Sequence, residues 1–175
     1  MLAALMAGLL APMPAQAGKA HEHGVARADI GVEAGRITLR LELPLDDLVG
    51  FERPPRTEAE RTAVAQALGK LQEAAQVVRI DAAGGCGAAR VELLAPVWGV
   101  GGPASGVPAK GGAAHADMQV TYEFRCGSVE RAGHLELGLF EAFARIRRVE
   151  VQAVAPKGQM KLVLRRPNTR VALAR

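Results

Sequence analysis

Two stretches of alternating residues, 25–32 and 36–43, place the strongest constraint on the fold. Every second residue in them is apolar, and most of the residues between are charged. A period of two is typical of a β-strand with one buried face, and the short segment 33–35 allows the two strands to pair as a hairpin. The residues predicted to face the core are Ala26, Ala28, Ile30, Val32, Ile37, Leu39, Leu41 and Leu43.

A helix is predicted to start after Thr57. Thr57 and Glu60 form a capping-box pattern, in which both side chains accept hydrogen bonds from backbone N–H groups that the helix leaves unpaired. Apolar residues at spacings of four and three then form one stripe, which is typical of an amphipathic helix. We expect the helix to lie on the apolar face of the hairpin. The stripe consists of Val64, Leu68, Leu71, Ala75 and Val78.

The rest of the chain is dominated by short apolar alternations. These predict further strands at 88–94, 118–126, 135–139, 149–154, 160–164 and 169–173. Residues 99–114 are rich in Gly, Pro and Ala, which is typical of a flexible linker. Many strands around one main helix indicate an α+β fold with a mainly antiparallel sheet.

The amino end resembles a cleavable export signal. An uncharged apolar run, 2–11, precedes Ala15-Gln16-Ala17, a small-x-small cleavage site, so residues 1–17 are predicted to be a signal peptide. The run is too short to cross a bilayer, which needs roughly 20 residues. No later stretch is apolar enough to do so. We therefore expect one periplasmic domain, residues 18–175, without a transmembrane segment.

Cys86 and Cys126 are the two cysteines of the chain. In an oxidising compartment an even number of cysteines favours a disulfide, here between these two residues. The alternative is a pair of thiolate metal ligands, although no closely spaced cysteine pair supports it.

The chain carries a formal net charge of +4, and its basic residues include two arginine clusters. Export and the low aromatic content of 3% argue against a nucleic-acid partner, which stacking side chains would bind. A basic face would instead suit a metal-free envelope adaptor for an anionic membrane or protein partner. The clusters comprise Arg145, Arg147, Arg148, Arg165 and Arg166.

Patterns that indicate catalysis are weak. Ser105 and Ser128 are the only serines, and neither lies in a G-x-S-x-G motif. The acidic pair Asp46-Asp47 is interpreted as the cap of a short turn after Pro44. The sequence thus predicts a binding protein and not an enzyme.

The histidines carry the most specific chemical signal. His21 and His23 are two residues apart, as are His115 and Asp117, and in an extended chain such pairs project from the same side. Imidazole and carboxylate groups are ligands that zinc accepts in tetrahedral sites. We expect these four residues to converge on one zinc ion, whereas His134 is interpreted as a surface residue.

Several segments resemble a family of zinc-regulated, zinc-binding periplasmic proteins of proteobacteria, the ZrgA-like proteins. The resemblance covers nearly all of the chain after residue 17, and its most specific parts are the HEHG and HAD blocks. It implies a periplasmic zinc-binding protein that assists zinc acquisition or buffering beside a periplasmic zinc-uptake component. Two departures stand out: 99–114 contains no histidine, where members often carry a His/Asp-rich insert, and Arg53 replaces a histidine. The matching segments are 21–26, 43–52, 55–61, 115–118, 122–126 and 139–140.

Overall fold

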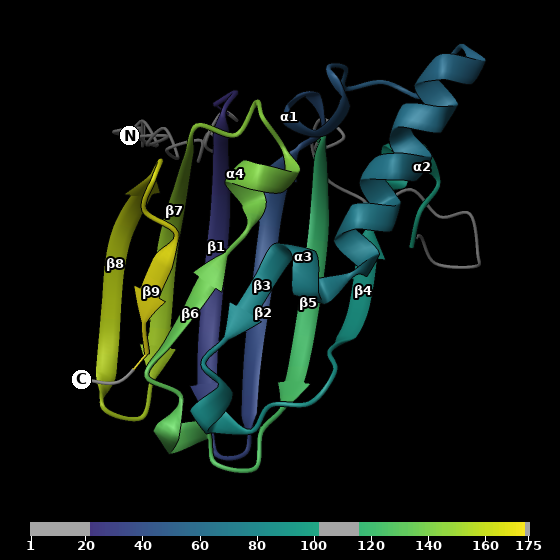
Figure 1. The fold of residues 1–175 in the computed structure, drawn as a ribbon. Helices are drawn as coiled ribbons and strands as arrows, with labels where there is room; N and C mark the ends of the chain where they lie inside the picture. Colours follow the sequence, from purple (N-terminus) through teal and green to yellow (C-terminus); the bar gives the residue numbers. More distant parts are fainter. Residues whose placement is uncertain (1–21, 102–115, 174–175) are drawn as a thin grey trace, which may run out of the picture.

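The computed structural model describes residues 22–101 and 116–173, and its largest element is a six-stranded sheet (Figure 1). The strand order is β4-β5-β2-β1-β7-β8. Neighbouring strands are antiparallel except β1 and β7, which run parallel. The strands are β1 (Val25–Glu33), β2 (Arg36–Pro44), β4 (Arg90–Leu94), β5 (Asp117–Arg125), β7 (Arg148–Ala155) and β8 (Gly158–Arg165).

The predicted hairpin is confirmed and forms the middle of this sheet. β1 and β2 pair in the register Ile30 opposite Leu39, so the alternating apolar residues of both strands share one face. Of the eight residues predicted for the core, seven are buried and only Val32 is partly exposed. The alternation therefore fixed both the pairing and the buried face.

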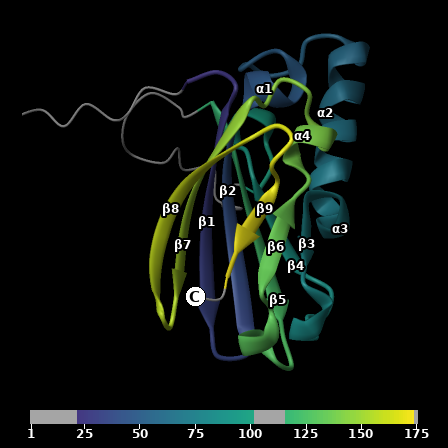
Figure 2. The ribbon, with the colours of Figure 1, turned by 60° about the vertical axis from the view of Figure 1, so that its left-hand side comes forward.

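A second sheet covers part of the apolar face of the first, as the edge-on view in Figure 2 shows. It consists of β3 (Val78–Ile80), β6 (His134–Leu137) and β9 (Arg170–Ala172), in the order β3-β6-β9. The predicted strands 135–139 and 169–173 correspond to β6 and β9, whereas neither β3 nor a separate sheet was predicted. Leu139, predicted as part of the strand 135–139, instead begins helix α4 (Leu139–Ala142).

The helix predicted from the capping box is α2 (Glu58–Gln72), and Glu60 N–H donates to Thr57 Oγ1 at 3.2 Å. The predicted apolar stripe is too long for one helix, because Ala75 and Val78 lie beyond its end. Helix α2 ends at Gln72, and a separate helix α3 (Ala74–Val77) leads into β3. Its predicted position is also wrong. α2 lies beside β4 and β5, where the buried Tyr122 hydroxyl donates to the Leu71 carbonyl at 2.6 Å, while the second sheet lies over the hairpin (Figure 1).

The disulfide between Cys86 and Cys126 is confirmed, with an S–S distance of 2.08 Å. Cys126 follows β5, and Cys86 lies between the 3₁₀ turn η1 (Ala82–Gly84) and β4. The two cysteines also pair as an isolated antiparallel bridge. The bond therefore ties the end of β5 to the segment that leads from the second sheet back to the first. The α+β fold with mainly antiparallel strands and one disulfide is confirmed.

The first residues of the predicted linker 99–114 belong to a hydrogen-bonded turn. After β4, the turn η2 (Pro96–Trp98) leads to Val100, which exchanges two backbone hydrogen bonds with Ala95, at 2.9 and 3.1 Å. Residues 99–101 are therefore part of a closed turn and not of a flexible linker. The remainder of the linker, like the predicted signal peptide 1–17, lies outside the described residues.

Candidate functional site

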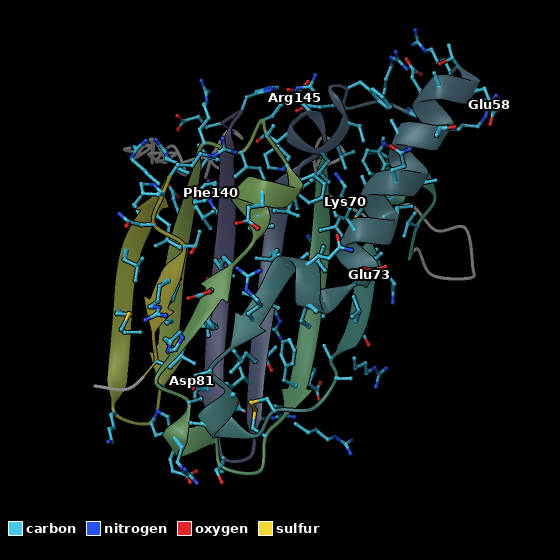
Figure 3. The ribbon with its side chains drawn as sticks, in the orientation of Figure 1. Glu58, Lys70, Glu73, Asp81, Phe140 and Arg145 are labelled. Carbon is cyan, nitrogen blue, oxygen red and sulfur yellow. A yellow bond between two sulfur atoms is a disulfide. The ribbon has the colours of Figure 1, made fainter. Side chains whose placement is uncertain are left out.

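Polar side chains gather at one end of the six-stranded sheet, which we call the α1 end. Here β1, β5 and β7 begin, β2 ends, and the short helix α1 (Leu45–Val49) follows β2 (Figure 1). Figure 3 shows Arg145 at this end, with Asp81 and the disulfide toward the opposite end, which we call the disulfide end. The acidic and histidine residues that the structure describes at the α1 end include Glu22, His23, Asp46, Asp47, Glu52 and Asp117.

The turn before β1 is held by the rest of the α1 end. Val25 N–H donates to the Glu22 carbonyl at 3.1 Å, and Gly24 adopts a φ of +83°, which favours glycine. Both carboxylate oxygens of the buried Asp47 accept from Gly24 N–H, at 2.7 and 2.8 Å. From the other side, Arg147 donates to the His23 carbonyl at 3.0 Å. The backbone of residues 23 and 24 is thus fixed between α1 and the segment before β7.

This arrangement corrects the interpretation of Asp46-Asp47 as a turn cap. Both residues lie in the first turn of α1, but no side chain caps the start of that helix. Asp47 instead binds a backbone N–H that is distant in the sequence. Burial raises the pKa of its carboxyl, and the hydrogen bond from Gly24 N–H acts in the opposite direction.

The imidazole of His23 has a carboxylate close to each ring nitrogen. Nδ1 lies 3.2 Å from Asp46 Oδ2, and Nε2 lies 3.6 Å from Glu52 Oε1. The His23 side chain is 58% exposed, so the ring lies at the surface. The hydrogen bond to Asp46 raises the pKa of His23 above its usual value, and the charge of Glu52 adds to this effect while desolvation opposes it.

Asp117 begins β5 and is buried. It pairs opposite Pro44, the last residue of β2, and the preceding Ala116 carbonyl accepts from Leu45 N–H at 2.8 Å. Glu22 and Asp117 line one small hollow together with Val25, Arg27, Glu42 and Pro44. The segment that leads into β5 therefore reaches the sheet beside the segment that precedes β1.

Of the four predicted zinc ligands, the structure describes His23 and Asp117, and both belong to the α1 end. His21 and His115 lie outside the described residues. Within residues 22–101 and 116–173, no three His, Cys, Asp or Glu side chains form a group that could hold a metal ion. The predicted four-residue set therefore stays a prediction.

Sequence reasoning missed Asp46, Glu52 and Arg147 as neighbours of His23. The contact between His23 and Asp46 could have been inferred from the hairpin, whose register pairs Arg27 with Glu42. In this register the residues just before β1 lie near the residues just after β2, and Asp46 is one of the latter. No comparable local signal relates Arg147 to His23, since their proximity depends on the parallel pairing of β1 with β7.

Arg53, which stands where the ZrgA-like proteins tend to have a histidine, has a structural role. Both terminal nitrogens of Arg53 donate to the Glu60 carboxylate, at 2.7 and 2.9 Å, and the same carboxylate serves the capping box of α2. These hydrogen bonds, together with one from Arg56 N–H, lower the pKa of Glu60 to about 2. Arg53 thus stabilises the start of α2 next to the α1 end.

The fourth histidine lies elsewhere. His134 begins β6, its side chain is 28% exposed, and its Nδ1 is 3.4 Å from Asp81 Oδ2. It is therefore partly covered, although it was interpreted as a surface residue. Its position in the second sheet makes it a suitable control for the histidines of the α1 end.

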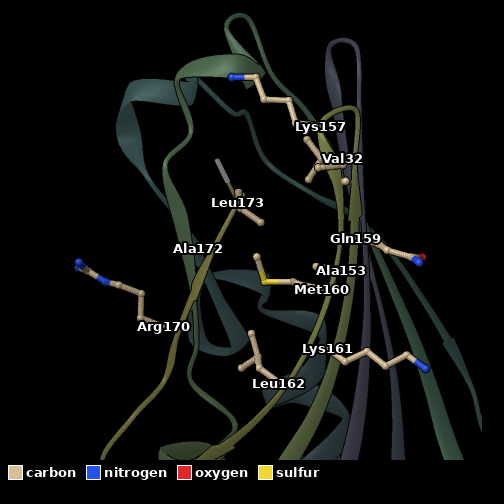
Figure 4. Close-up of a pocket in the computed structure, with 12 residues that line it drawn as sticks. Val32, Ala153, Lys157, Gln159, Met160, Lys161, Leu162, Arg170, Ala172 and Leu173 are labelled. Carbon is tan, nitrogen blue, oxygen red and sulfur yellow. The ribbon is translucent and has the colours of Figure 1, made fainter. Parts of the chain in front are cut away.

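A hollow of about 500 Å³ opens between β8 and β9. Figure 4 shows Met160, Leu162 and Leu173 directed into it. None of the described residues that line it is a His, Cys, Asp or Glu, so this hollow offers no metal ligand. The lining residues are Val32, Ala153, Ala155, Lys157, Gly158, Gln159, Met160, Lys161, Leu162, Arg170, Ala172 and Leu173.

The structure is thus an α+β domain that brings several carboxylates and the exposed His23 together at one end of its large sheet. The family model described as ZrgA family zinc uptake protein matches residues 20–173. The chain belongs to this family, as the resemblance predicted, and the protein has a role in zinc uptake. No curated protein matches the sequence at a significant level. In the described part of the chain, no helix has the length and hydropathy needed to cross a membrane.

Proposed function

We propose that the protein binds zinc in the periplasm, at its α1 end, and passes the ion to another component of zinc uptake. The observation that carries this proposal is the position of His23, whose exposed ring lies between two carboxylates at the end of the sheet where β5 also begins. Membership of a zinc uptake family supports zinc as the ion.

The chain connectivity supports the participation of the two histidines that the structure does not describe. His21 directly precedes Glu22, and His115 is two residues before Asp117. Glu22 and Asp117 line the same hollow, so described residues that follow the two histidines closely in the sequence lie together at the α1 end. The proposed ligands remain His21, His23, His115 and a carboxylate, for which the sequence predicts Asp117.

Binding is proposed in place of catalysis. A zinc hydrolase needs an open coordination position and a general base directed at the bound water. The carboxylates that contact His23 are instead arranged around its ring, which suits holding an ion.

The contacts of the arginines weaken the second hypothesis, a metal-free adaptor with a basic face. Arg147 binds the His23 carbonyl, and Arg148 lies 2.8 Å from Glu22 and 3.1 Å from Glu150. Arg166 donates to the Phe140 carbonyl at 2.7 Å. The three guanidinium groups are thus engaged within the fold, and that of Arg148 faces two carboxylates, so fewer of them are free for an anionic partner.

The test is a competition titration of the purified mature chain with a chelating zinc dye. Each of the substitutions His21→Ala, His23→Ala and His115→Ala is expected to weaken zinc binding at least tenfold, since a ligand is lost. His134→Ala is the matched control and should bind like the wild type. Equal losses at all four histidines would mean diffuse surface binding and would refute the site. Export is tested separately, by locating the full-length protein in cell fractions.

A further inference from the structure

The two ring nitrogens of His23 face different partners, and this difference determines which of them is free to bind a metal. Asp46 lies on α1, and its Oδ2 is 3.2 Å from Nδ1. Glu52 lies in the segment between α1 and α2, and its Oε1 is 3.6 Å from Nε2. The first distance is that of a hydrogen bond, and the second is longer than a hydrogen bond.

A neutral imidazole carries one N–H group and one lone pair. When Nδ1–H donates to Asp46, the lone pair is on Nε2 and is directed toward the side where Glu52 lies. Histidines that bind metals through one nitrogen commonly donate the other N–H to a carboxylate, which fixes the tautomer and the ring orientation. Asp46 is in the position to do this for His23.

The separation between Nε2 and Glu52 Oε1 also fits a shared zinc ion. Nitrogen and oxygen ligands lie about 2.0–2.2 Å from zinc, so two of them in a tetrahedral site are about 3.3–3.5 Å apart. The observed 3.6 Å is longer by only a few tenths of an ångström. A small rotation of the Glu52 side chain would close this gap.

The surroundings favour binding of an ion from solvent. The side chains of His23 and Glu52 are 58% and 39% exposed, so an ion reaches them without opening the fold. The backbone below the ring is rigid, because Asp47 holds Gly24 N–H and Arg147 holds the His23 carbonyl. A ligand that is already fixed in position loses less conformational entropy when it binds.

We propose that Glu52 is a zinc ligand that binds the ion together with His23 Nε2, and that Asp46 is the positioning residue that holds Nδ1–H. The inference rests on the zinc binding proposed for the α1 end. On the side of the ion where His23 binds, it assigns Glu52 as the carboxylate ligand, whereas the sequence predicts Asp117. It also assigns the nitrogen through which His23 binds.

The test compares Glu52→Gln and Asp46→Asn with the wild type in the zinc competition titration. Glu52→Gln removes a ligand but keeps the size of the side chain, and we expect at least a tenfold loss of affinity. Asp46→Asn should weaken binding by roughly 10- to 100-fold, as is typical for the carboxylate partner of a metal-binding histidine. Glu92→Gln is the matched control, because Glu92 lies on β4 in an exposed ion pair with Arg90, and it should bind zinc like the wild type.

A spectroscopic measurement separates ligation from a general electrostatic effect. The ¹⁵N shifts of the His23 ring in the zinc-loaded wild type should show a protonated Nδ1 and a metal-bound Nε2, and Asp46→Asn should disturb this pattern. If Glu52→Gln binds zinc normally while Asp117→Asn loses it, the assignment of Glu52 is overturned and the proposed function stands. If the wild type binds no zinc, the proposed function and the inference fail together.

Discussion

The α1 end and the disulfide end of the large sheet are stabilised by different kinds of interaction. At the α1 end, hydrogen bonds and ion pairs connect the turn before β1 to α1 and to the segment before β7. At the disulfide end, a covalent bond connects Cys86 to Cys126, and Asp81 accepts from the backbone N–H groups of Ala83 and Gly133, at 3.0 and 3.1 Å.

The comparison shows how the fold separates stability from chemistry. A covalent bond holds its strands together at any pH and in any ionic medium, but it has no group left to bind a ligand. Carboxylates and an imidazole respond to protons and metal ions because they are charged or become so. Under the function proposed above, the end that lacks the covalent bond is the end that binds zinc. Four predictions examine this difference.

Loss of the disulfide should have the largest effect on stability and little effect on zinc. The bond closes a loop of 40 residues, and its removal in Cys86→Ser/Cys126→Ser is expected to lower the free energy of unfolding by about 4 kcal/mol. Urea unfolding measures this loss, and the dye titration measures zinc affinity on the variant that is still folded. A marked loss of zinc affinity would show that the two ends are not independent.

Removal of the Asp47 carboxylate should affect both stability and zinc. Asp47→Ala leaves the buried Gly24 N–H without its acceptor, which is expected to cost about 2 kcal/mol in urea unfolding. Zinc affinity should fall as well, because the turn that carries His23 is released. Asp46→Ala, at a more exposed neighbouring position, is the control for stability and should change it by less than about 0.5 kcal/mol. An unchanged zinc affinity in Asp47→Ala would contradict a role in positioning His23.

The capping box should make a smaller contribution. Thr57→Ala removes the acceptor for Glu60 N–H at the start of α2, and we expect a loss of about 1 kcal/mol in the free energy of unfolding. Thr62→Ala is the matched control, since Thr62 is exposed in the interior of the same helix. Alanine is a better helix former than threonine, so this control should be neutral or slightly stabilising. A destabilisation of equal size in the two variants would exclude a capping effect.

The smallest effect is expected from the titration of Glu60. Its pKa is lowered from 4.5 to about 2 by the hydrogen bond from Arg53 and by those from backbone N–H groups. A carboxyl whose pKa is lower in the folded state stabilises the fold above its unfolded pKa, and this contribution is lost as the pH falls from about 4.5 toward 2. Urea unfolding of wild type and Glu60→Gln over this pH range should therefore converge as the pH falls. A difference that stays constant with pH would contradict the assignment, and solvent screening keeps the effect small.

The parts of the fold that were predicted correctly depend on local patterns. The hairpin follows from two-residue alternation, and the start of α2 follows from a pair of residues three positions apart. The second sheet was missed because β3, with three residues, is too short for a periodic signal, and because the alternations that predicted β6 and β9 do not show which strands they pair with. The placement of α2 was wrong because an apolar stripe shows which face is buried but not what covers it.

The zinc ligands were predicted from pairs whose members are close in the sequence, His21 with His23 and His115 with Asp117. The two members that the structure describes, His23 and Asp117, lie at one end of the sheet, and the set itself stays a prediction. The contact between His23 and Glu52 depends on how the segment after α1 turns back toward β1, which no periodicity encodes. The ion pair between Arg53 and Glu60 likewise joins the segment before α2 to its first turn, and the resemblance alone gave no sign of this contact.

Trp98 gives the protein a built-in optical reporter. It is the only tryptophan of the chain, and its ring centroid lies 6.5 Å from that of Phe51, the residue directly before Glu52. Its Nε1 is buried and has no hydrogen-bond partner among the described residues. Indole emission changes with the polarity and packing around the ring, so movement of the Phe51–Glu52 segment alters the fluorescence of a single chromophore. The proposed zinc binding can thus be tested on the unlabelled protein in real time, without a dye that competes for the metal.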